Sequence, residues 1–210
     1  MGLLRRLKSA LPVSLQKRLL FMYQFVQSLG PLHFECYVLV MEDAPDPRLD
    51  EVKIDVVESR QPLTAEQQTY LEHSDLAGLA LWTNLHRLRA GPGFLFLARA
   101  ADGCYCTYTW IVSSRYNRRR YPTMRGEQSL FLGPVYTDPR YRGQNIVARV
   151  MQYAIHYAKV HGYGPFYGLV APTNTASIRG CDKAGWKRLG LWRGTAMLRD
   201  RIVRSHEVPQ

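Results

Sequence analysis

Hydrophobic and polar residues repeat with two different periods along this chain, and the pattern predicts both strands and helices. Residues 33–41 are rich in aromatic and β-branched side chains and predict a strand. Residues 94–100 and 105–112 flank Asp102-Gly103, and an Asp-Gly pair in this place predicts a hairpin. Further strands are predicted at 52–58, 129–137 and 166–171, and two closing strands follow Gly185-Trp186.

Helices are predicted between these strands. Thr64 and Gln67 have the spacing of a capping box, and helical character continues to Arg89 with a break near Gly78. Another helix is predicted from Gly143 onward, and its single apolar face consists of Ile146, Val147, Val150, Met151, Ala154, Ile155 and Ala158. A short helix is predicted at 174–183. The chain is therefore of the α+β class, with α and β elements mixed.

The first thirty residues differ from the rest in composition. They contain five basic residues and no acid, and their leucines recur at helical spacing. A basic amphipathic helix of this kind lies on an anionic membrane surface, or it packs against its own domain with the basic residues in solvent. Both interpretations stay open. The predicted domains are a helical extension at 1–30 and a single domain at 31–210.

The charge balance favours anionic partners. The 210 residues include 28 Lys and Arg against 17 Asp and Glu, which gives a formal net charge of +11. A hydrophobic fraction of 46% excludes a disordered chain. No apolar run approaches the roughly 18 residues of a membrane span. We therefore expect a cytoplasmic protein, with peripheral contact to the inner face of the membrane through residues 1–20 as the further option.

Cysteines and a basic segment add little specific chemistry. The four cysteines, Cys36, Cys104, Cys106 and Cys181, form no C-x-x-C pair, which argues against a zinc site and favours reduced thiols; no metal is expected. Residues 115–121 interleave arginines with tyrosines, but no zinc-finger, basic-zipper or RNA-recognition signature accompanies them. We interpret this segment as a solvated loop or an anion-binding rim and expect no nucleic-acid partner.

The segment from Val135 to Ala148 carries the main chemical signal, because it places a strand, a tight turn and a helix N-terminus in succession. The first turn of a helix leaves backbone N–H groups without partners, and the helix dipole adds about half a positive charge there. Gly143 allows close approach of a ligand to the backbone, and Arg140 and Arg142 add full charges. The arrangement suits a pyrophosphate, although neither a P-loop nor a G-x-G-x-x-G motif is present.

A second segment, residues 174–186, follows that helix and an apolar strand. Asn174 is a good helix N-cap and Gly185 a good helix stop, so each also has a purely structural interpretation. Together the two segments resemble the GNAT superfamily of acyl-CoA-dependent N-acetyltransferases. The pyrophosphate motif of that family, R/Q-x-x-G-x-G/A, matches Arg140–Asn145 except at the last position. The later motif, N-x-x-A/S-I followed by G-F/W, is matched by Asn174, Ser177, Ile178, Gly185 and Trp186, and the clear resemblance covers about residues 129–190.

The resemblance implies a central mixed sheet flanked by helices and splayed open between the strands at 129–137 and 166–171, with acetyl-CoA as co-substrate in the gap. Pro134 agrees independently, because proline cannot donate to a β-ladder and belongs at an edge or a bulge. By resemblance, the N–H groups of Gly133 and Val135 bind the thioester oxygen as it becomes an oxyanion. The residues assigned to the pyrophosphate are Arg140, Arg142, Gly143, Gln144, Asn145, Ile146 and Val147, and those assigned to pantetheine are Asn174 and Ser177.

Two positions depart from the family pattern. Asn145 replaces a small residue in the phosphate-binding turn, and since Asn tolerates unusual backbone angles we expect a weakened site rather than a lost one. Cys181 stands where many members carry a tyrosine that protonates the departing CoA thiolate. It is either a poor acid in that role or a small buried hydrophobe.

Direct transfer to an amine also needs a base, because the nucleophile must be neutral. Family members often carry a carboxylate in the central strand, and the matching position here is Ser129. Glu127 lies two residues earlier, on the same face if the strand extends that far, and is the predicted base. Glu58, Tyr105 and Tyr108 are the other candidates.

The leading hypothesis is an acetyl-CoA-dependent N-acetyltransferase that transfers an acetyl group directly to the primary amine of a small acceptor. The net charge and the arginines at 115–120 favour an anionic acceptor, such as an amino sugar or an envelope-related amine. The alternative is a non-catalytic module that keeps the fold and binds acyl-CoA or a partner protein.

Overall fold

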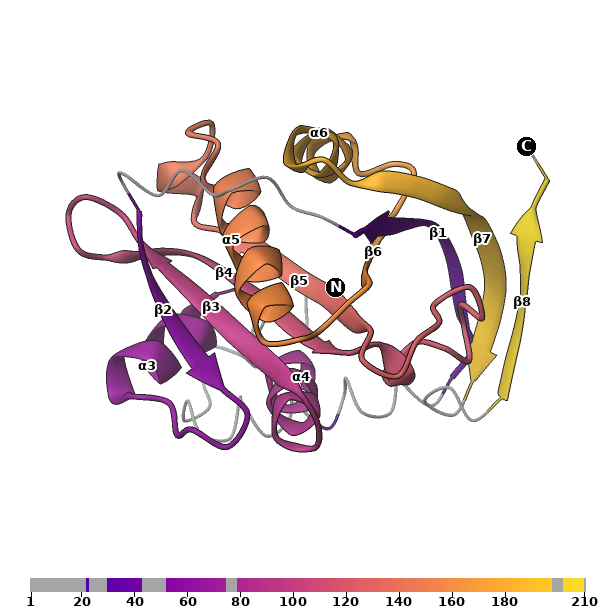
Figure 1. The fold of residues 1–210 in the computed structure, drawn as a ribbon, viewed down its shortest axis with the longest axis horizontal. Coiled ribbons are helices and arrows are strands. Elements are labelled where there is room, and N and C mark those ends of the chain that lie inside the picture. The colour runs from indigo at the N-terminus through magenta and orange to yellow at the C-terminus, as the bar shows by residue number, and fades with distance from the viewer. Residues whose placement is uncertain (1–21, 23–29, 43–51, 75–78, 198–201, 210) are drawn as a thin grey trace, which may run out of the picture.

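The computed structural model describes residues 22, 30–42, 52–74, 79–197 and 202–209, and the predicted extension at 1–30 lies almost wholly outside this part of the chain. Within these ranges the chain forms an eight-stranded mixed sheet with helices on both faces (Figure 1). The predicted α+β class is therefore confirmed. No helix in the described ranges is long and apolar enough to cross a membrane.

The observed elements follow the predicted order. The strands are β1 Leu32–Met41, β2 Lys53–Glu58, β3 Gly93–Arg99, β4 Tyr105–Ser113, β5 Leu130–Thr137, β6 Phe166–Val170, β7 Lys187–Met197 and β8 Ile202–Val208. The α-helices are α3 Ala65–His73, α4 Leu79–Arg89, α5 Ile146–Val160 and α6 Thr175–Ala184, and short 3-10 turns form at η1 Ser114–Tyr116 and η2 Pro139–Tyr141. The observed bounds lie within a few residues of the predicted ones.

Strand β1 lies far from its neighbours in sequence. The strand order is β2-β3-β4-β5-β6-β1-β7-β8, so the first strand is inserted between strands from the C-terminal part of the chain. Antiparallel ladders join residues 32–40 to β7 and residues 37–41 to β6 (Figure 1). The second half of β1 is consequently buried, and Leu39 is 2% exposed. The strand was predicted from the sequence, whereas its insertion was not.

Strands β5 and β6 separate after a short stretch of parallel pairing. Their ladder joins only residues 130–132 to residues 166–168, while β5 continues to Thr137. On its other edge β5 stays paired with β4, with a register shift at Pro134, since Gly133 lies opposite Trp110 and Val135 opposite Thr109. The predicted splay and the predicted bulge at Pro134 are confirmed, because a residue without an N–H interrupts the ladder.

Two hydrophobic clusters fill the two faces of the sheet. The predicted apolar face of α5 packs on one face, where Ala154, Ile155 and Ala158 are fully buried. Helices α3 and α4 cover the other face through Leu71, Leu81 and Leu88. On the α5 face a Cβ at Gly168 would lie 3.3 Å from the ring of Trp186. The Gly-Trp pair after α6 therefore ends that helix and packs an aromatic ring directly on the β6 backbone.

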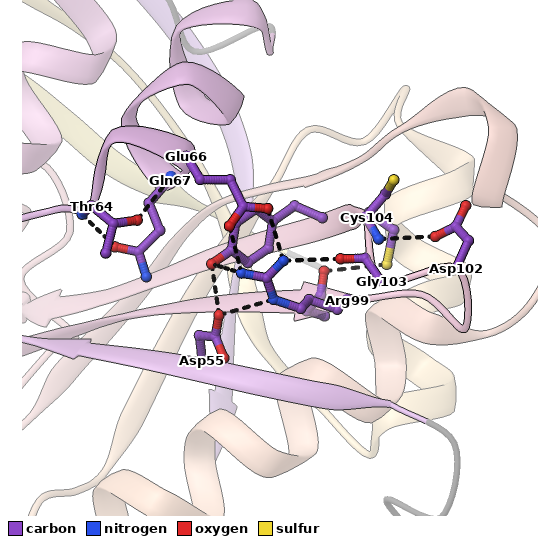
Figure 2. Close-up of polar contacts among 11 residues, drawn as sticks. Asp55, Thr64, Glu66, Gln67, Arg99, Asp102, Gly103 and Cys104 are labelled. Carbon is purple, nitrogen blue, oxygen red and sulfur yellow. Dashed lines mark hydrogen bonds and ion pairs between the residues drawn. The ribbon is translucent and has the colours of Figure 1, made fainter.

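Helix α3 is fixed at the edge of the sheet by polar contacts (Figure 2). The predicted capping box is present, because Gln67 N donates to Thr64 Oγ1 at 3.2 Å and Thr64 N donates to Gln67 Oε1 at 3.0 Å. In the first turn of the helix, Glu66 accepts two hydrogen bonds from Arg99 of β3, at 2.8 and 2.9 Å. Arg99 Nε also donates to Asp55 of β2 at 3.1 Å. A single guanidinium therefore joins α3 to two adjacent strands.

We expect Leu39→Ala to lower the free energy of unfolding by about 2–5 kcal/mol, because it opens a cavity in a strand that is paired on both edges. Leu32→Ala is the matched control, since Leu32 begins the same strand and is 49% exposed. This change should stay within about 0.5 kcal/mol. Urea unfolding measures both variants. Equal effects would contradict the placement of β1 inside the sheet.

Candidate active site

The turn between β5 and α5, residues 138–145, is held by its own polar groups at its start. Asp138 Oδ1 accepts from the backbone N of Arg140 at 2.9 Å and so caps η2. Its other oxygen pairs with the Arg140 guanidinium at 2.9 Å. Arg142 Nε donates to the carbonyl of Thr137 at 3.1 Å. These contacts fix the entrance of the turn and leave residues 142–145 exposed. We call residues 138–145 the β5–α5 turn.

The second half of the β5–α5 turn presents backbone N–H groups to solvent. Gly143 (φ 82°) and Asn145 (φ 59°) both have left-handed backbone conformations. No atom lies within 4 Å of a Cβ built on Gly143, so a ligand can reach the backbone there. The amides of residues 143–148 have no backbone acceptor in the described part of the chain. Six consecutive donors at a helix N-terminus form a site that fits a diphosphate.

The geometry explains the departure of Asn145 from the family motif. This residue is the N-cap of α5 and its side chain makes no capping hydrogen bond. Among residues with a side chain, Asn adopts the left-handed region more readily than most. Asn145 therefore supports the backbone conformation that a glycine would otherwise supply.

The two arginines of the β5–α5 turn have different electrostatic roles. The guanidinium of Arg140 forms two hydrogen bonds with the Asp138 carboxylate and lowers the pKa of that acid. Arg140 is thus largely neutralised by its neighbour. No carboxylate of the described residues pairs with Arg142, which is exposed beside Gly143. Of the two predicted phosphate ligands, Arg142 contributes more net positive charge.

The free edge of β5 provides the second predicted part of the site. Beyond Leu132 the strand has a partner only on its β4 side, so alternate backbone groups of residues 133–137 point toward the gap without a strand partner. A Cβ at Gly133 would collide with the ring of Phe131. A larger residue at this position would have to displace that ring, and Gly133 itself is buried at the bulge. The predicted roles of the Gly133 and Val135 amides stay predictions.

The middle of α6 lies beside the N-terminus of α5, since a Cβ on Gly180 would be 4.0 Å from Val147. Asn174 Oδ1 accepts from the N of Ser177 at 3.1 Å, so Asn174 is a helix cap, as its structural interpretation predicted. Both side chains are exposed. Their contact with pantetheine stays a prediction.

Cys181 is partly buried on α6 and packs against the hydrophobic cluster of the α5 face. Burial raises the pKa of its thiol to about 11, and the neighbouring charge of Asp182 adds to this shift. A raised pKa means that the protonated form persists until the pH approaches that value. At neutral pH the side chain is therefore protonated, and it is both a weak acid and a poor nucleophile.

The residues predicted for base chemistry lie in different surroundings. Ser129 is fully buried just before β5, where its hydroxyl lies 2.5 Å from Ser114 Oγ and donates to Gly126 O at 2.6 Å. Glu127 is exposed, and β5 begins only at Leu130, so strand alternation does not place it on the face of Ser129. Among the alternatives, Glu58 accepts from Tyr157 at 2.9 Å and Tyr105 donates to Asp55 at 2.6 Å, whereas Tyr108 is buried and stacks on Tyr136.

Sequence reasoning missed one contact of the β5–α5 turn. The hydroxyl of Tyr141 donates to Asp102 Oδ2 at 2.6 Å, across 39 positions of sequence. No local pattern signals such a pair, because Asp102 looks like an ordinary hairpin residue.

Among the described residues, no three His, Cys, Asp or Glu side chains lie close enough together to hold a metal ion.

The model of the acetyltransferase (GNAT) family matches residues 61–186, and the chain belongs to this family. The family uses acetyl-CoA, which is therefore the co-substrate of this chain. The matched range starts after β1 and β2 and ends just before β7. No curated protein matches the sequence.

Solved structures share the fold at low sequence identity. A GNAT-family protein from Novosphingobium aromaticivorans gives a TM-score of 0.53 at 16% identity, over 86% of this chain and 69% of that one. A GNAT acetyltransferase from Colwellia psychrerythraea has a TM-score of 0.52 and 14% sequence identity, over 87% of this chain and 58% of that one. The glucosamine N-acetyltransferase region of a fungal multidomain β-N-acetylglucosaminidase has a TM-score of 0.54 and 17% sequence identity, over 82% of this chain and 22% of that one. Identities this low show the fold alone.

The left-handed geometry at Asn145 predicts how substitutions there affect CoA binding. Asn145→Gly should leave the dissociation constant for CoA unchanged or lower, since glycine adopts this conformation freely. Asn145→Val should raise it by about tenfold, because a β-branched residue pays about 1–2 kcal/mol in the left-handed region. Titration calorimetry measures both, and thermal unfolding checks that each variant is folded. Equal affinities for the two variants would contradict a geometric requirement at this position.

Proposed function

We propose that this protein transfers the acetyl group of acetyl-CoA directly to the primary amine of a small anionic acceptor. The observation that carries the proposal is the row of unpaired amides at the N-terminus of α5, next to the free edge of β5. This row suits the diphosphate of the co-substrate, and the free edge suits its extended arm. The acetyltransferase family is established by the match at residues 61–186, and the amine acceptor is the proposed part.

The proposed roles of the chain follow from these groups. When bound, acetyl-CoA supplies an activated acetyl group and a thiolate leaving group. The Gly133 and Val135 amides donate to the acyl oxygen as negative charge develops on it, in a strand whose backbone is already fixed by β4. The backbone amides of the β5–α5 turn and the side chain of Arg142 hold the diphosphate and thereby position the acyl carbon. The amine attacks in its neutral form, and an amide bond forms as the C–S bond breaks.

Two protons move in this reaction. The attacking amine loses one, which we assign to Glu127 acting through water, since the hydroxyl of Ser129 is engaged inside the protein. The departing thiolate gains one from water or, less readily, from Cys181, which is protonated at neutral pH but is a weaker acid than an ordinary thiol. Where the cysteine is the donor, solvent then restores its proton. Neither role requires a metal ion.

The proposal of an anionic acceptor is supported by the loop between β4 and β5, residues 114–129, which we call the basic loop. It contains Arg115, Arg118, Arg119, Arg120 and Arg125 against a single acid, Glu127. It crosses the sheet face opposite α5, where Arg120 lies 5.6 Å from the ring centroid of Phe34 on β1. It also contacts β6, because the N of Arg125 donates to Tyr167 Oη at 3.1 Å.

Within the basic loop two polar donors are buried without a protein partner, Asn117 Nδ2 and Arg118 Nε. Asn117 is only 6% exposed. Buried donors of this kind are usually satisfied by a ligand oxygen or an ordered water. A carboxylate or phosphate on the acceptor would supply such an oxygen close to the start of β5.

We expect Arg142→Asp to raise the dissociation constant for CoA by at least about tenfold, because a hydrogen bond to a charged group is worth about 1.5–3 kcal/mol. Lys159→Asp is the matched control, since it makes the same charge change at the other end of α5. It should leave CoA affinity unchanged. Titration calorimetry measures both. Failure of the unaltered protein to bind any CoA thioester, or equal affinities for both variants, would contradict the assigned site.

For the acceptor, we expect turnover on anionic primary amines to exceed turnover on polyamines and peptides, measured as release of the free CoA thiol. Arg125→Glu should raise KM for the anionic acceptor severalfold, because it reverses a charge on the basic loop. Arg204→Glu makes an equal charge change on β8 and is the control. It should leave KM for the anionic acceptor unchanged. A preference for polyamines would contradict the anionic acceptor. CoA binding without turnover on any amine would favour a non-catalytic module.

A further inference from the structure

The β5–α5 turn is tied to the tip of the β3–β4 hairpin, residues 101–104. Tyr141, at the end of η2, donates its hydroxyl to Asp102 Oδ2 at 2.6 Å. The other oxygen of Asp102 accepts from the N of Cys104 at 3.0 Å. One carboxylate therefore closes the hairpin and holds the turn at the same time. We call residues 101–104 the hairpin tip.

The hairpin tip is itself held firmly from its other side (Figure 2). Arg99 donates to the carbonyl of Gly103 at 2.9 Å. The same guanidinium binds Glu66 of α3 and Asp55 of β2, and it lies 3.8 Å from the ring centroid of Tyr105. Asp102 thus projects from a fixed frame that includes two strands and the first turn of α3. A tyrosine bound to it is fixed relative to the same frame.

The exposed part of the β5–α5 turn has few contacts of its own. Gly143 has open space around it, and residues 142–145 are exposed. The last ring before these residues is that of Tyr141, which packs against the hydrophobic cluster of the α5 face. The position of the following amides therefore depends on where Tyr141 is held.

We propose that Asp102 is a positioning residue for the co-substrate: through Tyr141 it fixes the backbone amides of residues 143–145 at the place where the diphosphate binds. The inference rests on the proposed CoA site and adds to it a residue from a distant hairpin. Asp102 makes no contact with the co-substrate in this proposal. Its effect is to reduce the conformational freedom that binding would otherwise remove.

The hydrogen bond between Tyr141 and Asp102 persists from mildly acidic to alkaline pH. Donation by Tyr141 lowers the pKa of the Asp102 carboxyl, so the anion is lost only below its usual range. The same bond raises the pKa of Tyr141 to about 12, so the phenol keeps its proton until the pH nears that value. The bond is therefore intact from mildly acidic to alkaline pH, and the effect of removing it should not vary between pH 6 and 9.

The test compares two tyrosine–carboxylate hydrogen bonds: Tyr141 to Asp102, just before α5, and Tyr157 to Glu58, within α5. Tyr141→Phe and Asp102→Ala should each raise KM for acetyl-CoA and the dissociation constant for CoA about fivefold, with kcat changed less than twofold. Asp102→Asn keeps an acceptor oxygen and should recover part of the loss. In the double variant Tyr141→Phe/Asp102→Ala, the loss should equal that of either single change, since both remove one bond.

Tyr157→Phe is the matched control, because it removes a tyrosine–carboxylate hydrogen bond of 2.9 Å, to Glu58 Oε1, farther along α5. It should lower thermal stability as much as the test variants and leave KM for acetyl-CoA unchanged. Unchanged CoA affinity in Tyr141→Phe and Asp102→Ala, while the unaltered protein binds CoA, would overturn this inference alone. Additive losses in the double variant would also overturn it. Absence of CoA binding by the unaltered protein would instead overturn the proposed function.

Discussion

Three residue pairs join β5 to β6, and beyond them each strand keeps a partner only on its outer edge. β5 continues along β4 to Thr137, and β6 continues along β1 to Val170. The gap therefore lies between two half-sheets, and each half-sheet is held together by its own strand pairing. Unpaired backbone groups at a sheet edge can pair with water, a ligand or another strand, and the bulge at Pro134 interrupts this edge. In the proposed function, the extended arm of acetyl-CoA binds along this edge.

The insertion of β1 follows from the same constraint. β6 is a strand of five residues that loses its β5 partner after Gly168, so a second neighbour is needed to keep it in the sheet. β1 supplies this neighbour and joins β6 to the β7–β8 hairpin. A segment that precedes the family match in the chain thereby completes the half-sheet on the far side of the gap.

The β5–α5 turn is a candidate anion-binding site that depends mainly on backbone conformation. Gly143 and Asn145 turn the chain through left-handed conformations, and the amides that follow have no backbone acceptor in the described part of the chain. Folding leaves these donors unpaired, so their hydrogen bonds remain for an anion. Arg142 adds charge beside them, whereas the charge of Arg140 is balanced by Asp138. The site is thus mostly backbone, with one effective cation.

The sequence by itself determined the elements and the local chemistry of this protein. Alternation, capping residues and the Asp-Gly turn act over a few residues, so the strands, the helix starts and the hairpin could all be read from their own segments. The candidate anion-binding turn was also local, because Arg140 to Asn145 lie together in the chain. The bulge at Pro134 followed from the missing N–H of one residue.

The tertiary structure alone decided which distant segments meet. Nothing in residues 33–41 indicates pairing with both β6 and β7, since any apolar strand could fill that place. Likewise, Asp102 and Tyr141 have no mutual signal, because their contact depends on how the hairpin lies against the helix. Ser129 could be aligned with a family carboxylate, but its burial against Ser114 depends on the path of the basic loop. Local patterns fix what each segment becomes, whereas packing of the whole chain fixes what it touches.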